Sequence, residues 1–178
     1  ATLPKKLAVN AKKVAFFPGS SLGNFAPKDS LGFLKNVRAS VGENGALLIG
    51  LDLIKDHDVL NAAYNDQQGI TREFNLNVLS HLNELGAGTF NLDFFEHKAF
   101  FNEKESRIEM HLVSKIDQVV NLFSIPLVFK QGEHIVTEYS YKFNTDQFIE
   151  FAKQAGFEGK AVWEDSGSNF ALFWLESM

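Results

Sequence analysis

Cysteine is absent from the 178 residues of this chain. Its absence excludes disulfide bonds, thiolate metal ligands and a cysteine nucleophile. No apolar run approaches the roughly 20 residues that a membrane-spanning helix requires, so we expect no membrane partner. The N-terminal stretch 1–6 has no apolar core of the signal-peptide type, and we expect no export signal and a cytoplasmic location.

Basic residues are also in short supply, with 17 Lys and Arg against 22 Asp and Glu. Binding to a phosphate backbone depends on a basic surface that releases counterions, so we expect no nucleic-acid partner. The five histidines are dispersed and form no metal-binding motif, and no Ser-His-Asp arrangement follows from the spacing. We therefore expect no metal site.

Phenylalanine is abundant, at 18 residues. The simpler interpretation is a core packed with phenylalanine, and the alternative is a partly aromatic ligand pocket. Hydrophobic residues make up 45% and charged residues 22% of the chain, which is typical of a globular protein.

The beginning of the chain predicts a βαβ unit. Residues 13–18 form an apolar run closed by Gly19, which is typical of a strand buried on both faces of a parallel sheet. Residues 27–41 predict a helix, and residues 46–52 form a second apolar run that ends in an acid. Strand, helix and strand at this spacing predict parallel pairing with a right-handed crossover.

Two helices and an antiparallel block are expected next. Residues 58–65 and 70–85 predict the helices, the second of which begins at Thr71 or Gly69. One side of this second helix carries an apolar stripe of Phe74, Val78, Leu82 and Leu85. The alternating segments that predict strands are 90–102, 107–114, 119–130 and 133–143. Gln131 and Gly132 would connect the last two of these strands tightly.

The end of the chain predicts a helix over 144–155, capped by Asn144, and two closing strands over 159–163 and 169–175. The fold class is therefore α/β, a mixed sheet interrupted by an antiparallel insertion. A doubly wound sheet needs about five parallel strands and only two are found at the start. We therefore expect the chain to be the C-terminal part of a longer protein.

Several polar side chains are candidates for a ligand site, each with a structural alternative. The loop 18–24 either forms a plain turn or lets its glycines approach a ligand while Asn24 donates and accepts hydrogen bonds. Tyr64 and Met110 are core residues by default. Glu138 and Ser140 share one strand face, which is either solvated or directed into a pocket that suits a hydrogen-bonding ring such as imidazole.

Six segments, in order, carry a resemblance to a known family. They are residues 16–25 (FFPGSSLGNF), 47–56 (LLIGLDLIKD), 63–66 (AYND), 69–75 (GITREFN), 107–110 (RIEM) and 137–143 (TEYSYKF). Together they resemble the histidine-specific, S-adenosylmethionine-dependent methyltransferases, which include the histidine Nα-methyltransferases of ergothioneine biosynthesis.

The resemblance implies the C-terminal part of a class I, Rossmann-like methyltransferase sheet with an inserted α+β antiparallel substrate-binding domain. The implied boundaries are 1–54 for the partial sheet, 55–144 for the insertion and 145–178 for the closing elements. The implied reaction is three methyl transfers from S-adenosylmethionine, the co-substrate, to the α-amine of a small-molecule partner, L-histidine.

The site residues implied by the resemblance fall into three groups. Asn24 and Tyr64 would hold the carboxylate and amine end of the amino acid, while Gly19 and Thr71 would lie near its backbone. Glu138 and Ser140 would bind the imidazole, in a pocket lined by Met110. The displacement depends on positioning, so no catalytic residue is assigned. The attacking amine must be neutral, and we therefore expect the carboxylate at the ring end.

One departure from the family pattern concerns the methyl donor. The family's glycine-rich donor motif, its ribose-binding acid and its N-terminal aromatic residues have no counterpart here. We therefore expect the chain alone to bind S-adenosylmethionine poorly and not to turn over. Two alternatives stay open, a family member acting on another amine and a binding or assembly module without enzymatic activity. The sequence does not indicate an oligomeric state.

Overall fold

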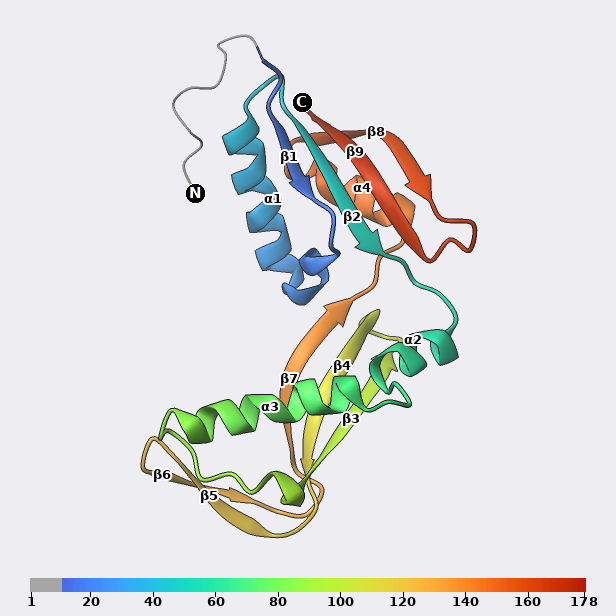
Figure 1. Cartoon of the computed structure of the whole chain (residues 1–178). Coiled ribbons are helices and arrows are strands. Elements are labelled where there is room, and N and C mark those ends of the chain that lie inside the picture. The colour runs from blue at the N-terminus through green and yellow to red at the C-terminus, as the bar shows by residue number, and fades with distance from the viewer. Residues whose placement is uncertain (1–10) are drawn as a thin grey trace. The chain divides into compact units, whose positions relative to one another are not determined.

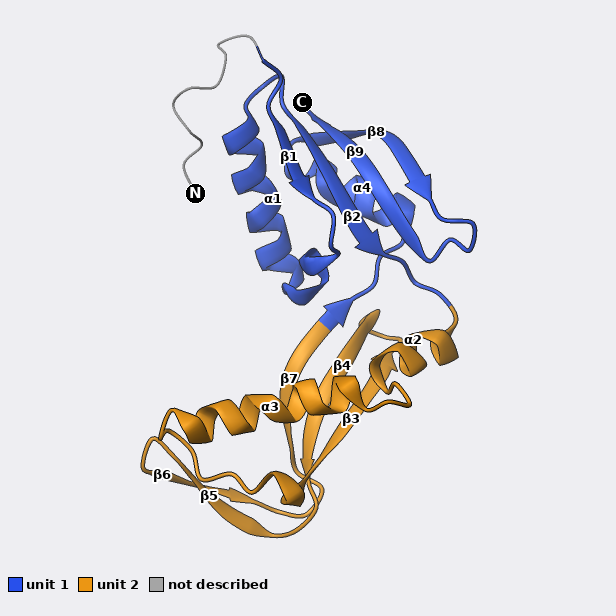
Figure 2. Ribbon diagram, in the orientation of Figure 1, with its two compact units in different colours: residues 1–55, 140–178 blue, residues 56–139 orange. Residues whose placement is uncertain are grey.

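The computed structural model describes residues 11–178, which form two compact units (Figures 1 and 2). Unit 1 contains the described residues up to 55 and residues 140–178, and unit 2 contains residues 56–139. The stretch 1–6, which carries the expectation of no export signal, lies outside the described residues. The boundaries 1–54, 55–144 and 145–178 stay a prediction about functional organisation.

Unit 1 is a mixed four-stranded sheet with the strand order β1-β2-β9-β8. Its strands are β1 (Val14–Phe17), β2 (Ala46–Asp52), β8 (Phe157–Glu164) and β9 (Phe170–Ser177). Its α-helices are α1 (Pro27–Val41) and α4 (Thr145–Lys153). β1 pairs with β2 in parallel, and β9 pairs with both β2 and β8 in antiparallel fashion. The predicted βαβ unit and the closing antiparallel pair are both confirmed.

The two helices of unit 1 pack on one face of this sheet. Leu34 of α1 and Phe148 of α4 belong to the same buried cluster as Ile49 of β2 and Phe173 of β9. Side chains alternate between the faces of a strand, so the opposite face is left with less cover. Phe16 of β1 is consequently 67% exposed. The prediction that the first strand is buried on both faces was wrong for this reason.

Unit 2 combines two α-helices and one 3-10 helix with short antiparallel strands (Figure 1). Its helices are α2 (His57–Tyr64), α3 (Ile70–Glu84) and the 3-10 helix η2 (Leu92–Phe94). Its strands are β3 (Phe95–Asn102), β4 (Arg107–Ser114), β5 (Gln118–Leu122), β6 (Ile125–Phe129) and β7 (His134–Tyr141), the last of which continues into unit 1. The strands form one sheet of order β3-β4-β7 and a separate β5-β6 hairpin. The predicted strand 90–102 starts later than expected, because residues 92–94 form a helical turn.

The segment 119–130 is a hairpin, and the prediction of one continuous strand was wrong. Phe123 and Ser124 both have positive φ values, 49° and 66°, and they reverse the chain between β5 and β6. A turn of this kind usually contains glycine or asparagine, so the sequence carried no turn signal here. β7 consequently neighbours β4 in the sheet, whereas β6 pairs with β5.

The buried side of α3 also differs from the prediction. Leu76 and Leu79 are buried in a cluster with Phe95 and Leu112, whereas Phe74 is 63% exposed. Val78 and Leu85, which belong to the same predicted stripe, are exposed as well. Leu82, the fourth residue of that stripe, packs against the buried cluster. On the buried side of the helix, Asn75 donates to the His111 carbonyl oxygen of β4 at 3.1 Å.

Candidate functional site

The loop after β1 is fastened to the end of β2 within unit 1. The Ser20 backbone N–H donates to the Gly50 carbonyl oxygen at 3.0 Å, and the Ser20 hydroxyl accepts from the Asp52 backbone N–H at 2.8 Å. The loop then forms the 3-10 helix η1 (Ser21–Asn24). Gly19 and Asn24 both lie exposed in this loop. Their backbone and amide groups therefore face solvent at the carboxyl end of the sheet, where ligands of α/β folds bind.

A buried lysine forms an ion pair beside this loop, also within unit 1. The Lys142 ammonium lies 2.8 Å from Asp52 Oδ2 and donates to Ser140 Oγ at 2.9 Å. The side chain of Lys142 is only 1% exposed. Lys55 binds the other oxygen of the same carboxylate at 2.5 Å. Ser140, a predicted site residue, is therefore buried and held by a charged neighbour.

Sequence reasoning missed Lys142, although one signal was present. Lys142 lies two residues after Ser140 and four after Glu138, so the alternation of β7 extends to it. The contact itself depends on long-range pairing, because the Phe143 N–H donates to the Asp52 carbonyl oxygen at 3.1 Å. This backbone bond brings Lys142 next to Asp52, which is 90 positions earlier in the sequence.

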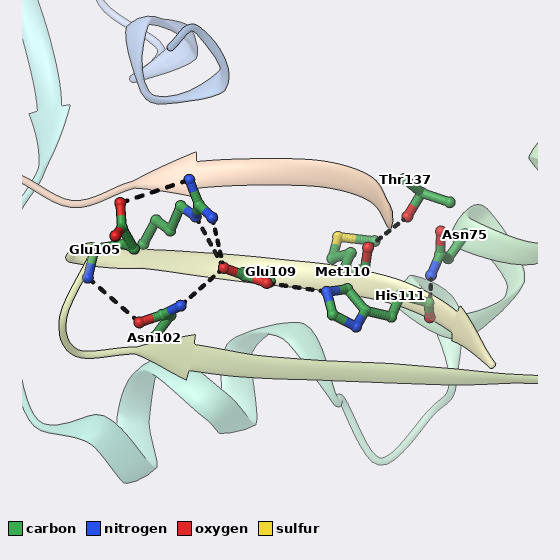
Figure 3. Close-up of polar contacts among 8 residues, drawn as sticks. Asn75, Asn102, Glu105, Glu109, Met110, His111 and Thr137 are labelled. Carbon is green, nitrogen blue, oxygen red and sulfur yellow. Dashed lines mark hydrogen bonds and ion pairs between the residues drawn. The ribbon is translucent and has the colours of Figure 1, made fainter. Parts of the chain in front are cut away.

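Tyr64 and Met110 lie together in unit 2. Met110 is buried with Leu60 and Ile108 in a small cluster, and Tyr64 packs against it from the end of α2. Figure 3 shows Thr137 of β7 donating its hydroxyl to the Met110 carbonyl oxygen, at 3.0 Å. The default interpretation of both residues as core residues describes this packing, and their roles toward a ligand stay predictions.

The buried carboxylate of Glu109, next to Met110 on β4, is the centre of a hydrogen-bond network. Glu109 accepts hydrogen bonds from Asn102, from Arg107 and, at 3.0 Å, from His111 (Figure 3). Burial alone would raise the pKa of Glu109, but the hydrogen bonds from Arg107, Asn102 and His111 outweigh it and lower that pKa below its ordinary value. The guanidinium of Arg107 also lies over the ring of Tyr139, 3.7 Å from its centroid. The network therefore fixes the strand that carries Met110.

Thr71 contributes to the start of α3. Its backbone N–H donates to Asp66 Oδ1 at 2.8 Å, and the Ile70 N–H donates to the other carboxylate oxygen at 2.9 Å. Hydrogen bonds from the Thr71 backbone, from its side chain and from Ile70 lower the pKa of Asp66 to about 2. The expected start of the helix near Gly69 is confirmed, and Thr71 is held by a carboxylate from the preceding turn.

The predicted site residues are thus distributed over both units. Gly19, Asn24 and Ser140 belong to unit 1, and the remaining four are Tyr64, Thr71, Met110 and Glu138 of unit 2. Glu138 is half-buried on β7, the strand that links the two units. The convergence of all seven residues on one ligand stays a prediction.

Phenylalanine packs the core of unit 1 and also lines a cavity there; whether that cavity binds a ligand stays a prediction. Phe148, Phe157 and Phe173 are fully buried core residues. A cavity of about 200 Å³ lies nearby and is lined mainly by aromatic side chains, with Lys142 at its wall. Its lining comprises Phe25, Pro27, Ser30, Tyr141, Lys142, Phe143, Asn144, Gln147, Phe148 and Phe151.

Among residues 11–178, no three histidine, aspartate or glutamate side chains gather in an arrangement that could hold a metal ion. None of the helices in this described part of the chain combines the length and the apolar character needed to cross a bilayer.

Comparison with known proteins gives consistent matches. A family model described as "Histidine-specific methyltransferase, SAM-dependent" matches residues 1–177. The chain is 36% identical over 163 residues to a histidine N-alpha-methyltransferase of Mycolicibacterium smegmatis, covering 90% of this chain and 51% of that protein. It is 34% identical to a histidine N-alpha-methyltransferase of Mycobacterium tuberculosis with the same coverage. The chain thus spans about half the length of these relatives.

One solved structure is reported among the matches to this chain. It is an S-adenosylmethionine-dependent methyltransferase from Clostridium acetobutylicum, with a TM-score of 0.48 and 9% sequence identity, covering 96% of this chain and 61% of that one. The strand order and pairing of this chain themselves confirm the α/β class predicted from the sequence, a mixed sheet interrupted by an antiparallel block.

That the family's donor-binding motifs have no counterpart in this chain stays a prediction. Asp52 is the acid at the carboxyl end of β2, the edge where α/β sheets bind ligands. Both of its oxygens are bound by lysines, Lys55 and Lys142, so we give it no role toward the methyl donor. We assign no described residue to S-adenosylmethionine.

Proposed function

Because this chain belongs to the family of histidine-specific, S-adenosylmethionine-dependent methyltransferases, we propose that the protein methylates the α-amine of L-histidine. Three successive transfers would give Nα,Nα,Nα-trimethylhistidine. S-adenosylmethionine is the co-substrate of the family and supplies an electrophilic methyl group. The cytoplasmic location expected in the absence of a recognised export signal remains part of this proposal.

The choice of histidine is carried by one observation, the placement of Glu138 and Ser140 two residues apart on β7. A carboxylate accepts from one ring N–H, and a hydroxyl can donate to the other ring nitrogen. Phenylalanine offers neither group. Glu138 is half-buried, and an apolar ring beside it would supply no hydrogen-bond donor to its carboxylate, so we expect such a site to disfavour phenylalanine.

The remaining residues would hold the amino-acid end of the substrate. Asn24 is exposed at the end of η1, where its amide can reach a carboxylate, and Gly19 leaves space beside it. Tyr64 packs beside Met110, so the two would bind adjacent parts of one ligand. No carboxylate is placed at the amine end in this proposal, because a carboxylate there would favour the protonated, unreactive amine.

The test is an assay of the protein with whatever residues its gene encodes on either side of this chain. We expect mono-, di- and trimethylhistidine in sequence when it is incubated with S-adenosylmethionine and L-histidine, detected by mass spectrometry. We expect no product from phenylalanine. If histidine stays unmodified while another amine is methylated, the substrate assignment is wrong.

A matched pair of variants separates histidine recognition from general methyl transfer. Glu138→Ala should abolish the preference for histidine, whereas Glu96→Ala, which removes an exposed carboxylate on β3, should leave it unchanged. An unchanged histidine preference in Glu138→Ala would favour the alternative of a family member acting on a different amine.

A further inference from the structure

The side chain of Asn75, on α3 in unit 2, uses both of its amide hydrogens. Asn75 is 1% exposed. Its Nδ2 lies 3.1 Å from the His111 carbonyl oxygen (Figure 3) and 2.9 Å from His97 Nδ1. A carbonyl oxygen only accepts, so the nitrogen of the amide lies on that side and its second hydrogen is donated to the ring. His97 Nδ1 therefore carries a lone pair and no proton.

The other ring nitrogen of His97 leads independently to the same assignment. His97 Nε2 lies 2.9 Å from the carbonyl oxygen of Tyr64. That oxygen has no hydrogen to donate, so Nε2 must carry the ring proton and donate it. The ring is thus held as the Nε2–H tautomer, between a donor on α3 and an acceptor at the end of α2.

One polar atom of Asn75 stays unsatisfied in this arrangement. Asn75 Oδ1 is buried and has no hydrogen-bond partner among residues 11–178. An unsatisfied buried acceptor costs free energy. Turning the amide over would set Oδ1 against the His111 carbonyl oxygen and would leave His97 Nδ1 without its donor. The orientation of Asn75 is therefore imposed by its two partners.

The carbonyl group that His97 binds belongs to a predicted ligand residue. Tyr64 is the last residue of α2, and the last carbonyl groups of a helix have no partner within the helix. His97 supplies such a partner from β3. The backbone at Tyr64 sets the point from which its side chain leaves the helix. The histidine therefore also fixes that point, beside Met110.

Two asparagines fasten the same end of α2 to the strand. Asn65 Nδ2 donates to the Ala99 carbonyl oxygen at 3.0 Å, and Asn61 Oδ1 accepts from the Phe101 N–H at 2.8 Å. These contacts use backbone groups of β3, which is an edge strand of its sheet. They hold the helix end on either side of Tyr64, and His97 binds Tyr64 itself.

We propose that His97 is a positioning residue for Tyr64: Asn75 holds its ring as a single tautomer, and the ring in turn places Tyr64 for the amino-acid substrate. The inference rests on the proposed function, in which Tyr64 holds the carboxylate and amine end of histidine. All three residues belong to unit 2. A displaced tyrosine would weaken binding in the ground state and in the transition state alike, so the effect falls on KM rather than on kcat.

The first experiment measures initial rates against histidine concentration with the full protein that the gene encodes. His97→Phe keeps an aromatic ring and removes both hydrogen bonds. We expect KM for histidine to rise about tenfold, with kcat changed much less. His97→Gln keeps a donor and an acceptor and should recover part of the lost affinity. An unchanged KM in His97→Phe would overturn the inference.

A double variant separates positioning from a general loss of structure. Tyr64→Phe should raise KM by removing the hydroxyl, and His97→Phe added to it should raise KM little further, because the histidine acts through Tyr64. Effects that multiply would contradict this. His57→Phe is the matched control, since it makes the same exchange at the other end of α2, where the ring packs on Phe101. Its KM should stay near the wild-type value.

A spectroscopic measurement on the wild-type protein keeps the inference testable even if His97→Phe fails to fold. In protein labelled with ¹⁵N, the His97 ring should show a protonated Nε2 and an unprotonated Nδ1. An Nδ1–H tautomer or an imidazolium pattern would overturn the inference, because either would set a ring N–H against the amide hydrogens of Asn75. A wild-type protein that shows the expected tautomer and methylates no histidine would instead overturn the proposed function, and the role of Tyr64 with it.

Discussion

Gly23 lies against the backbone of Tyr141, so closely that an added Cβ would come within 2.7 Å of the Tyr141 carbonyl oxygen and 3.3 Å of its nitrogen. Backbone atoms cannot move aside as a flexible side chain can. The Gly23→Ala variant should therefore lose about 1–3 kcal/mol of unfolding free energy, measured by denaturant unfolding. Gly19→Ala is the control, because its nearest atom is Ser21 Oγ at 3.8 Å. Equal stabilities of the two variants would contradict the close packing.

The first turn of α3 depends on Asp66, whose carboxylate accepts from the Ile70 and Thr71 N–H groups. Asp66→Ala should speed amide hydrogen exchange at both positions. The pKa of Asp66 is lowered from 3.8 to about 2. The Asp66 carboxylate therefore stabilises the folded chain fully above pH 3.8, and this stabilisation is lost as the pH falls toward 2. Glu73→Ala removes an acid from the same turn and should leave exchange at Ile70 and Thr71 unchanged.

The elements governed by local patterns were predictable from the sequence. The parallel β1-α1-β2 unit followed from two apolar runs and the helix between them. Asn144 was expected to cap α4, and its side chain accepts from the Asp146 and Gln147 backbone N–H groups. These features depend on neighbouring residues, which a sequence displays directly.

Features that depend on distant pairing or on strained backbone were not predictable. Phe123 and Ser124 have positive φ values, which such residues rarely adopt. The alternating pattern of residues 119–130 therefore predicted one strand and gave no sign of the turn. The contact between Lys142 and Asp52 needs two segments far apart in sequence to pair. Ser140 could be named from its resemblance to a family motif, but the lysine that holds it could be found only from the structure.

The turn between β5 and β6 offers a test by stabilisation. Ser124 is exposed and has a φ of 66°, a conformation that costs a residue with a side chain about 1 kcal/mol relative to glycine. Ser124→Gly should therefore raise the unfolding free energy by about 1 kcal/mol. The same exchange at Ser80, inside α3, should lower it by about 0.5 kcal/mol. If Ser124→Gly and Ser80→Gly both lower the unfolding free energy by similar amounts, Ser124 does not adopt the left-handed turn conformation.

His111 makes unit 2 sensitive to acid. Burial lowers the pKa of His111 below its ordinary value of 6.5, and the hydrogen bond with Glu109 opposes the shift without cancelling it. The ring of His134 stacks on His111 with centroids 4.3 Å apart, and its charge, like that of Lys98, disfavours protonation further. At pH values between the lowered pKa of His111 in the folded chain and 6.5, His111 binds a proton more readily in the unfolded chain than in the folded chain. Stability must therefore fall as the pH drops below 6.5.

The measurement is the thermal unfolding midpoint of wild type and His111→Gln at several values between about pH 7 and pH 5. We expect the wild-type midpoint to fall over this range and the His111→Gln midpoint to fall less, whatever its value at neutral pH. His81→Gln, at an exposed histidine of α3, should keep the wild-type slope. Parallel curves for wild type and His111→Gln would assign the acid sensitivity to other groups. Both proteins should lose further stability below pH 4.5. The reason is that hydrogen bonds from Arg107 and Asn102 hold the pKa of Glu109 below its ordinary value of 4.5, and His111→Gln leaves these bonds in place.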